Sequence, residues 1–128
     1  MSDPENIIKT CTLAGGVTAE VADATSHYFG GYYHVKIRIC ADVPVTPASF
    51  DTDGDFRDAL CRLGSTVRFS RDLEKMAVPV GEIADIRRQL LEAFDTNVLS
   101  YLSRNDFAVS FVRSEYRRIL KQASPRFR

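Results

Sequence analysis

Residues 22–38 read ADATSHYFGGYYHVKIR, a glycine pair flanked by aromatic, β-branched and charged residues. Glycine adopts positive φ without steric cost, so Gly30-Gly31 is typical of a two-residue turn between antiparallel strands. Pairing about this turn places Phe29 opposite Tyr32, His27 opposite His34, and Asp23 opposite Arg38. The stretch therefore predicts a β-hairpin with a defined register.

This register divides the hairpin into two unlike faces, because successive side chains of a strand point to opposite sides. The first face is mainly apolar and carries Ala22, Ala24, Tyr28, Tyr33, Val35, Ile37, Ile39 and Val43. The second face is polar and aromatic and carries Asp23, Thr25, His27, Phe29, Tyr32, His34, Lys36 and Arg38. We expect helices to cover the first face and the second to remain available for binding.

Three further segments complete the predicted sheet. A second glycine pair at Gly15-Gly16 follows an apolar segment, and Val67 and Phe69 alternate with polar residues. Strands are expected near 7–14, 17–29, 32–43 and 66–71. The segment 17–29 should lie in the middle of an N-terminal β-meander, to which one later strand is added.

The helices are predicted from apolar residues at three- and four-residue spacing. A short helix is expected over 55–63, where Gly64 is well placed to end it. A second helix follows Pro79 and breaks at Thr96-Asn97. Residues 107–112 fit either a strand or a helix, but the helical pattern runs longer and Asp106 can cap it, so we predict a helix. The fold class is α+β: an antiparallel sheet of about four strands with helices packed on one face.

Length and composition indicate one ordinary globular domain over residues 1–128. The chain has 45% hydrophobic and 27% charged residues and no net charge. The ends, 1–6 and 123–128, are expected to be disordered. The N-terminal residues are acidic, and no apolar run approaches the ~20 residues that a membrane span needs. We therefore expect a cytoplasmic protein that does not enter a membrane and needs no cofactor.

Metal binding is weakly indicated by two residue types. The cysteines Cys11, Cys40 and Cys61 are odd in number and widely spaced, which suggests neither a disulfide framework nor a zinc site. His27 and His34 are the only histidines, and the predicted register would bring their Cβ atoms to roughly 5 Å. Two imidazoles still fall short of the three protein ligands usual at catalytic zinc. The pair is therefore a metal candidate of low probability.

Basic residues raise the hypothesis of single-stranded nucleic-acid binding. Arg113, Arg117 and Lys121 recur at four-residue steps, and Lys36 and Arg38 lie near aromatic residues on the hairpin. The zero net charge and the sequence pI near 6.7 argue against this hypothesis.

Catalysis is not indicated by any motif: the sequence contains no nucleophile elbow, phosphate loop, dinucleotide fingerprint or HExxH helix. Our leading hypothesis is a non-catalytic module that self-associates or docks another protein through the second hairpin face. The interface residues would be His27, Phe29, Tyr32, His34, Lys36 and Arg38. The alternative is a small-molecule or metal-binding domain, enzymatic or not, with its site near His27 and His34.

Overall fold

A 13-residue strand, β4 (Tyr32–Pro44), forms the centre of the sheet in the computed structural model, which describes residues 6–123. Val35, Ile37, Ile39, Ala41 and Val43 are buried along β4, and the residues between them are polar. Such alternation is typical of a strand with one covered and one open face.

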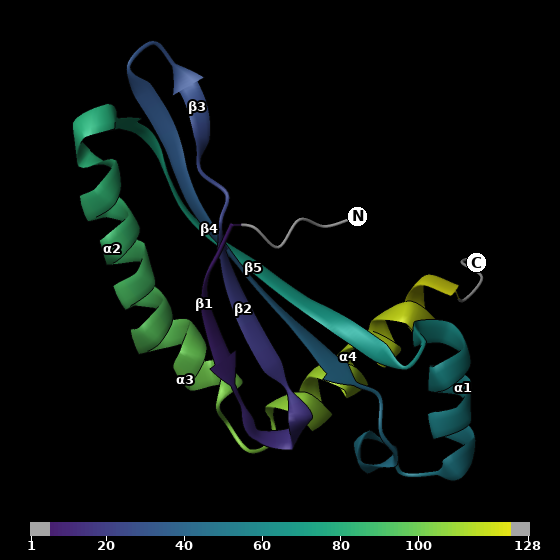
Figure 1. Cartoon of the computed structure of the whole chain (residues 1–128). Coiled ribbons are helices and arrows are strands. Elements are labelled where there is room, and N and C mark those ends of the chain that lie inside the picture. Colours follow the sequence, from purple (N-terminus) through teal and green to yellow (C-terminus); the bar gives the residue numbers. More distant parts are fainter. Residues whose placement is uncertain (1–5, 124–128) are drawn as a thin grey trace.

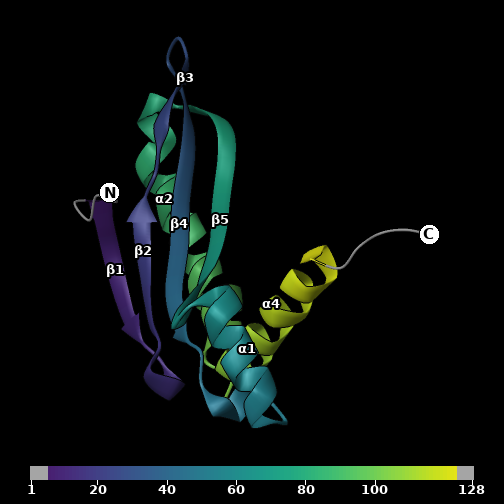
Figure 2. The ribbon, with the colours of Figure 1, turned by 90° about the vertical axis from the view of Figure 1, so that its right-hand side faces the viewer.

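All strand pairs are antiparallel, and β4 pairs with three other strands. The remaining strands are β1 (Ile7–Thr12), β2 (Thr18–Asp23), β3 (Ser26–Phe29) and β5 (Thr66–Pro79). β5 follows β4 along its whole length, while β2 and β3 share the other edge of β4 and β1 flanks β2 (Figure 2). The predicted strand 17–29 is thus two strands, interrupted at Ala24 and Thr25.

The hairpin register is correct only at its tip. Phe29 faces Tyr32, but Tyr28 is an extra residue in β3, so that His27 faces Tyr33 and Ser26 faces His34. The predicted pairing of His27 with His34 is therefore wrong. The one-residue shift persists into β2, where Asp23 faces Ile37 and Ala22 faces Arg38.

This shift exchanges the faces of several residues, because opposite residues in an antiparallel pair share a face. Asp23 lies on the helix-covered side, where it forms an ion pair with Arg87 (Oδ2 to Nη2, 3.0 Å). Ala22 lies on the open side, contrary to the prediction. The β4 residues lie on the faces expected of them, since the bulge leaves the alternation of β4 intact.

The helices are α1 (Asp53–Leu63), α2 (Ile83–Ala93), α3 (Leu99–Leu102) and α4 (Phe107–Ala123). α2 and α4 pack against β4, and α1 packs against α4 near the end of the sheet, as Figure 1 shows. The main core joins sheet residues such as Ile39 and Phe69 to Ala59 of α1, Phe94 after α2, and Val112 of α4. The α+β class, the antiparallel sheet and the one-sided helices confirm the predicted fold.

Several predicted boundaries need correction. The short helix begins at Asp53, where the Thr52 hydroxyl accepts a hydrogen bond from the Asp55 amide (3.0 Å) and caps it. Residues 94–98 continue α2 as a π-helical turn, so the predicted break at Thr96-Asn97 is wrong. The helix predicted over 107–112 is confirmed within α4.

Two expectations concern the ends of the chain and the membrane. The ends predicted to be disordered, 1–6 and 123–128, lie outside the described residues except for Asn6 and for Ala123, which is the last residue of α4. Within residues 6–123, no helix combines the length and apolar character needed to cross a bilayer.

Candidate interaction surface

Exposed apolar side chains gather at the turn between β3 and β4. Eight large hydrophobic residues are exposed in the described part of the chain, and five of them belong to this end of the sheet. We call these five the tip patch: Tyr28, Phe29, Tyr32, Met76 and Val80. Phe29 is 73% exposed and Val80 is 62% exposed. Figure 1 shows this turn at one end of the molecule, beside the start of α2.

Two strand irregularities lie at the tip patch. Tyr28 is the extra residue in β3, and β5 carries a second bulge between Lys75 and Val78, where Ala77 has φ +56°. Bulges often re-aim side chains beside functional sites. Beyond the second bulge, the Val80 amide donates a hydrogen bond to the Gly31 carbonyl (3.1 Å), which fixes Val80 beside the hairpin turn.

The size of the tip patch can be compared with known interfaces. At their exposed fractions, the three aromatic residues alone leave roughly 300–400 Å² accessible. Together with Met76 and Val80, the patch falls in the range of ~300–600 Å² given for the largest apolar patch on a typical monomer. A stable interface needs about 800 Å² from each partner. The tip patch is therefore large enough for the centre of an interface but needs a surrounding polar rim.

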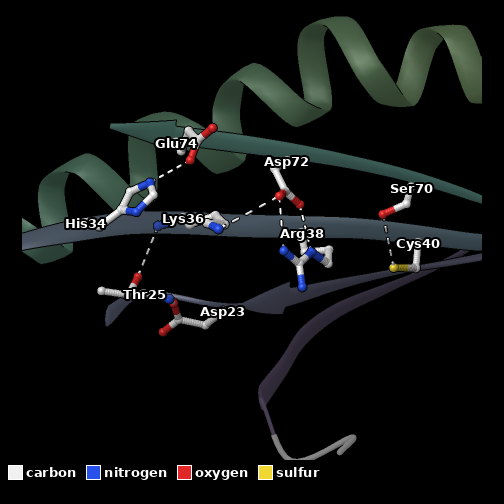
Figure 3. A network of polar contacts seen from close by, with 9 residues as sticks. All are labelled: Asp23, Thr25, His34, Lys36, Arg38, Cys40, Ser70, Asp72 and Glu74. Atoms are coloured by element: carbon white, nitrogen blue, oxygen red, sulfur yellow. Dashed lines mark hydrogen bonds and ion pairs between the residues drawn. The ribbon is translucent and has the colours of Figure 1, made fainter. Parts of the chain in front are cut away.

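The open face of the sheet carries a ladder of ion pairs (Figure 3). Arg38 donates to both carboxylate oxygens of Asp72 (2.8 and 3.1 Å), and the Lys36 Nζ lies 3.9 Å from the same group. His34 Nε2 lies 2.5 Å from Glu74 Oε1. The hydrogen bond from Arg38 lowers the pKa of Asp72 below its usual value.

The ion-pair ladder involves three of the six residues predicted to form the site. Of the six predicted residues, Phe29 and Tyr32 belong to the tip patch, whereas His34, Lys36 and Arg38 are engaged with carboxylates of β5. Arg38 and Lys36 share the single carboxylate of Asp72, and His34 contacts Glu74, so these side chains already have partners within the sheet. Tyr28 was expected on the helix-covered face, but it is exposed at the bulge of β3. Met76 and Val80 were missed, because nothing in the sequence indicates that β5 ends beside the hairpin turn.

His27 lies on the other face from His34. Its Nε2 donates to the Gly30 carbonyl (2.5 Å), and its ring packs edge-on against Tyr33 with the centroids 5.2 Å apart. The two histidines therefore do not form one metal site. Within the part of the chain that the structure describes, no three or more His, Cys, Asp or Glu residues are grouped to hold a metal ion.

A groove of about 350 Å³ lies at the opposite end of the open face. Its lining combines alternate residues of neighbouring strands with residues at their ends: Gly16, Thr18, Glu20, Cys40, Asp42, Pro44, Thr66 and Arg68. Arg68 and Asp42 form an exposed ion pair across it (3.1 Å). The groove offers hydroxyl, carboxylate and guanidinium groups to a small polar molecule, but it is distant from the predicted histidine site.

The basic residues of α4 do not act as one cluster. Arg113 Nε donates to the Ser49 carbonyl (2.8 Å), and its Nη2 lies 3.7 Å from Asp51. Arg113 thus anchors α4 to the segment before α1, while Arg117 and Lys121 are exposed. The nucleic-acid hypothesis therefore has two available cations on this helix instead of three.

Next to Arg113, Tyr116 ties α4 to α1. Its hydroxyl donates to Asp58 Oδ2 (2.7 Å), which also accepts from Arg62 Nε (2.8 Å). The hydrogen bond to Asp58 raises the pKa of Tyr116 to about 12, and the same bond lowers the pKa of Asp58. The arrangement explains the buried tyrosine as a structural link between helices.

Comparison with protein families, curated proteins and solved structures finds no match to this chain.

Proposed function

We propose that this chain is a protein-interaction module that self-associates or docks another protein through the tip patch. The observation that carries the proposal is that, of the eight large hydrophobic residues exposed within residues 6–123, five lie at one end of the sheet. Scattered apolar residues are normal on a protein surface, but a contiguous patch is typical of a docking site. Tyrosine, phenylalanine and methionine are enriched at interfaces.

The surroundings of the tip patch support the same proposal. His34 and Glu74 lie on the adjacent part of the open face and are partly exposed. They would supply the polar rim that a small apolar centre needs. We further propose that the protein acts in the cytoplasm, since Cys11, Cys40 and Cys61 are all free thiols and disulfides are rare there.

The proposal predicts that replacing Phe29 and Tyr32 by serine abolishes association. We expect the wild-type chain to form a dimer or larger species as its concentration rises in sedimentation velocity, with the double variant remaining monomeric. Ile8→Ser is the matched control, because Ile8 is also exposed but lies on β1, away from the hairpin tip. A folded double variant that sediments like the wild type at every concentration, and binds every wild-type partner equally, would overturn the proposal.

A further inference from the structure

The outer edge of β5 is open in its second half. Among the elements within residues 6–123, β5 pairs only with β4. Figure 2 shows no other strand or helix beside the upper half of β5 along the edge that faces away from β4. An unpaired edge presents backbone N–H and C=O groups that another chain can pair with. We consider the segment from Arg71 to Met76, before the Ala77 bulge.

Two cations on this segment have no carboxylate partner among residues 6–123. Arg71 faces Ile39 and Lys75 faces Val35, which places both on the helix-covered side of the sheet. In the described part of the chain, neither forms an ion pair. The Arg71 guanidinium instead lies over the rings of Phe69 and Tyr101, at 5.5 and 5.9 Å from their centroids.

The acids of the same segment have partners on the other side of the sheet. Asp72 binds Arg38, and Glu74 contacts His34, both on the open face. Within residues 6–123, the edge therefore combines two cations that form no ion pair on the covered side with acids that have partners on the open face. Arg71 and Lys75 would therefore attract an added strand that carries negative charge on the helix-covered side of the sheet.

We propose that this edge binds an extended acidic segment of a partner protein as an added β-strand. Arg71 and Lys75 are four residues apart on one side of β5, a distance of roughly 13 Å along a strand. The complementary segment carries two carboxylates four positions apart on one of its faces, with an apolar residue midway opposite Leu73. This inference does not depend on the tip patch, which uses other side chains.

Charge argues against a second copy of β5 as the occupant. The covered side of β5 carries Val67, Phe69, Arg71, Leu73 and Lys75, none of them acidic. Pairing of β5 with itself would leave both cations opposite apolar or like-charged residues, which gives no attraction. A nucleic acid would use the cations but not the backbone edge, and it would meet the carboxylates of Asp72 and Glu74 nearby.

The test is an NMR titration of the full chain with the capped peptide Glu-Thr-Val-Thr-Glu. We expect amide shifts concentrated at residues 71–76 and about tenfold weaker binding of the matched Gln-Thr-Val-Thr-Gln peptide. Lys75→Glu should weaken binding of the acidic peptide by a similar factor. Lys121→Glu, an exposed cation on α4, is the charge-matched control and should leave binding unchanged.

Three outcomes would overturn the inference. Absent or equal shifts with both peptides would remove the role of charge, and shifts confined to the tip patch would relocate the site. Stronger binding of a ten-nucleotide oligothymidylate to residues 71–76 would identify a nucleic-acid surface instead. The double variant of Phe29 and Tyr32 distinguishes the two proposals. If it still associates like the wild type and binds the acidic peptide normally, the proposed function fails and this inference stands.

Discussion

At the residue scale, Asp72 is the carboxylate that organises the open face. It accepts two hydrogen bonds from Arg38 and lies near Lys36, and these contacts lower its pKa. A carboxyl group with a lowered folded-state pKa stabilises the fold above its unfolded-state pKa of about 3.9, and this stabilisation is lost as the pH falls through the lower folded-state value. The ladder is therefore a source of acid sensitivity.

We predict that Asp72→Asn lowers the free energy of unfolding by about 1 kcal/mol at pH 7, the range expected for a charged hydrogen bond that is partly exposed. Chemical denaturation at pH 7 and at pH 2–3 would measure the effect, which should disappear in acid. Glu20→Gln is the control, because Glu20 lies on the same face without an ion pair in the described chain. A loss of stability that persists unchanged in acid would contradict the electrostatic explanation.

Ala77 is the second informative residue, since it is exposed and has φ +56°. An L-residue with a side chain is strained there, whereas glycine is not. We predict that Ala77→Gly stabilises the protein by roughly 0.5–1 kcal/mol, measured by urea denaturation. The same substitution at Ala22, within β2, should destabilise by a similar amount, so a loss of stability at both positions would refute the prediction.

At the element scale, the link between α1 and α4 depends on one hydroxyl. The pKa of Tyr116 is raised to about 12 by its hydrogen bond to Asp58. A tyrosine with a raised folded-state pKa stabilises the fold below its unfolded-state pKa of about 10, and that contribution is lost as the pH rises toward 12. The attachment of α4 should therefore weaken in alkali.

We predict that Tyr116→Phe lowers the melting temperature at pH 8 and that the difference from the wild type shrinks as the pH rises from 10 to 12. Thermal melts over this range would measure it. Tyr101→Phe is the control, because Tyr101 is a partly exposed tyrosine whose hydroxyl has no hydrogen bond among the described contacts. A constant difference between Tyr116→Phe and the wild type at all pH values would exclude a role for tyrosine ionisation.

The elements themselves were predictable to different degrees. β4 is identified by apolar residues at every second position, and α2 and α4 by apolar residues at three- and four-residue steps. These spacings arise because only one face of each element is buried. The predicted strand over 66–71 is the first half of β5, which continues to Pro79. The second half was not predicted, since Asp72, Glu74 and Lys75 have no strong strand preference and are held by pairing with β4. The Tyr28 bulge was not predicted, since pairing about Gly30-Gly31 assumes one residue of β3 for each residue of β4.

At the scale of the whole molecule, the helices leave one sheet face and two edges open to solvent. Phe29 and Tyr32, two of the predicted interface residues, are exposed at the hairpin tip. The predicted face of His27 is wrong, because a one-residue shift changes the face of every residue beyond the bulge. Met76, Val80, Arg71 and Lys75 were not predicted as site residues, because their positions at the tip and on the edge depend on strand pairing across the sheet.

The position of β4 between early and late elements has a consequence for the order of folding. Only Gly30 and Gly31 separate β3 from β4, whereas α1 intervenes before β5. A hairpin with so short a turn closes within about 1–10 μs, while pairing across an intervening helix must first pay a larger loop-closure entropy. During synthesis the hairpin is also made before α1, α2 and α4. We therefore expect the hairpin with its exposed aromatic residues to form during synthesis, before the helices pack against the covered face of β4.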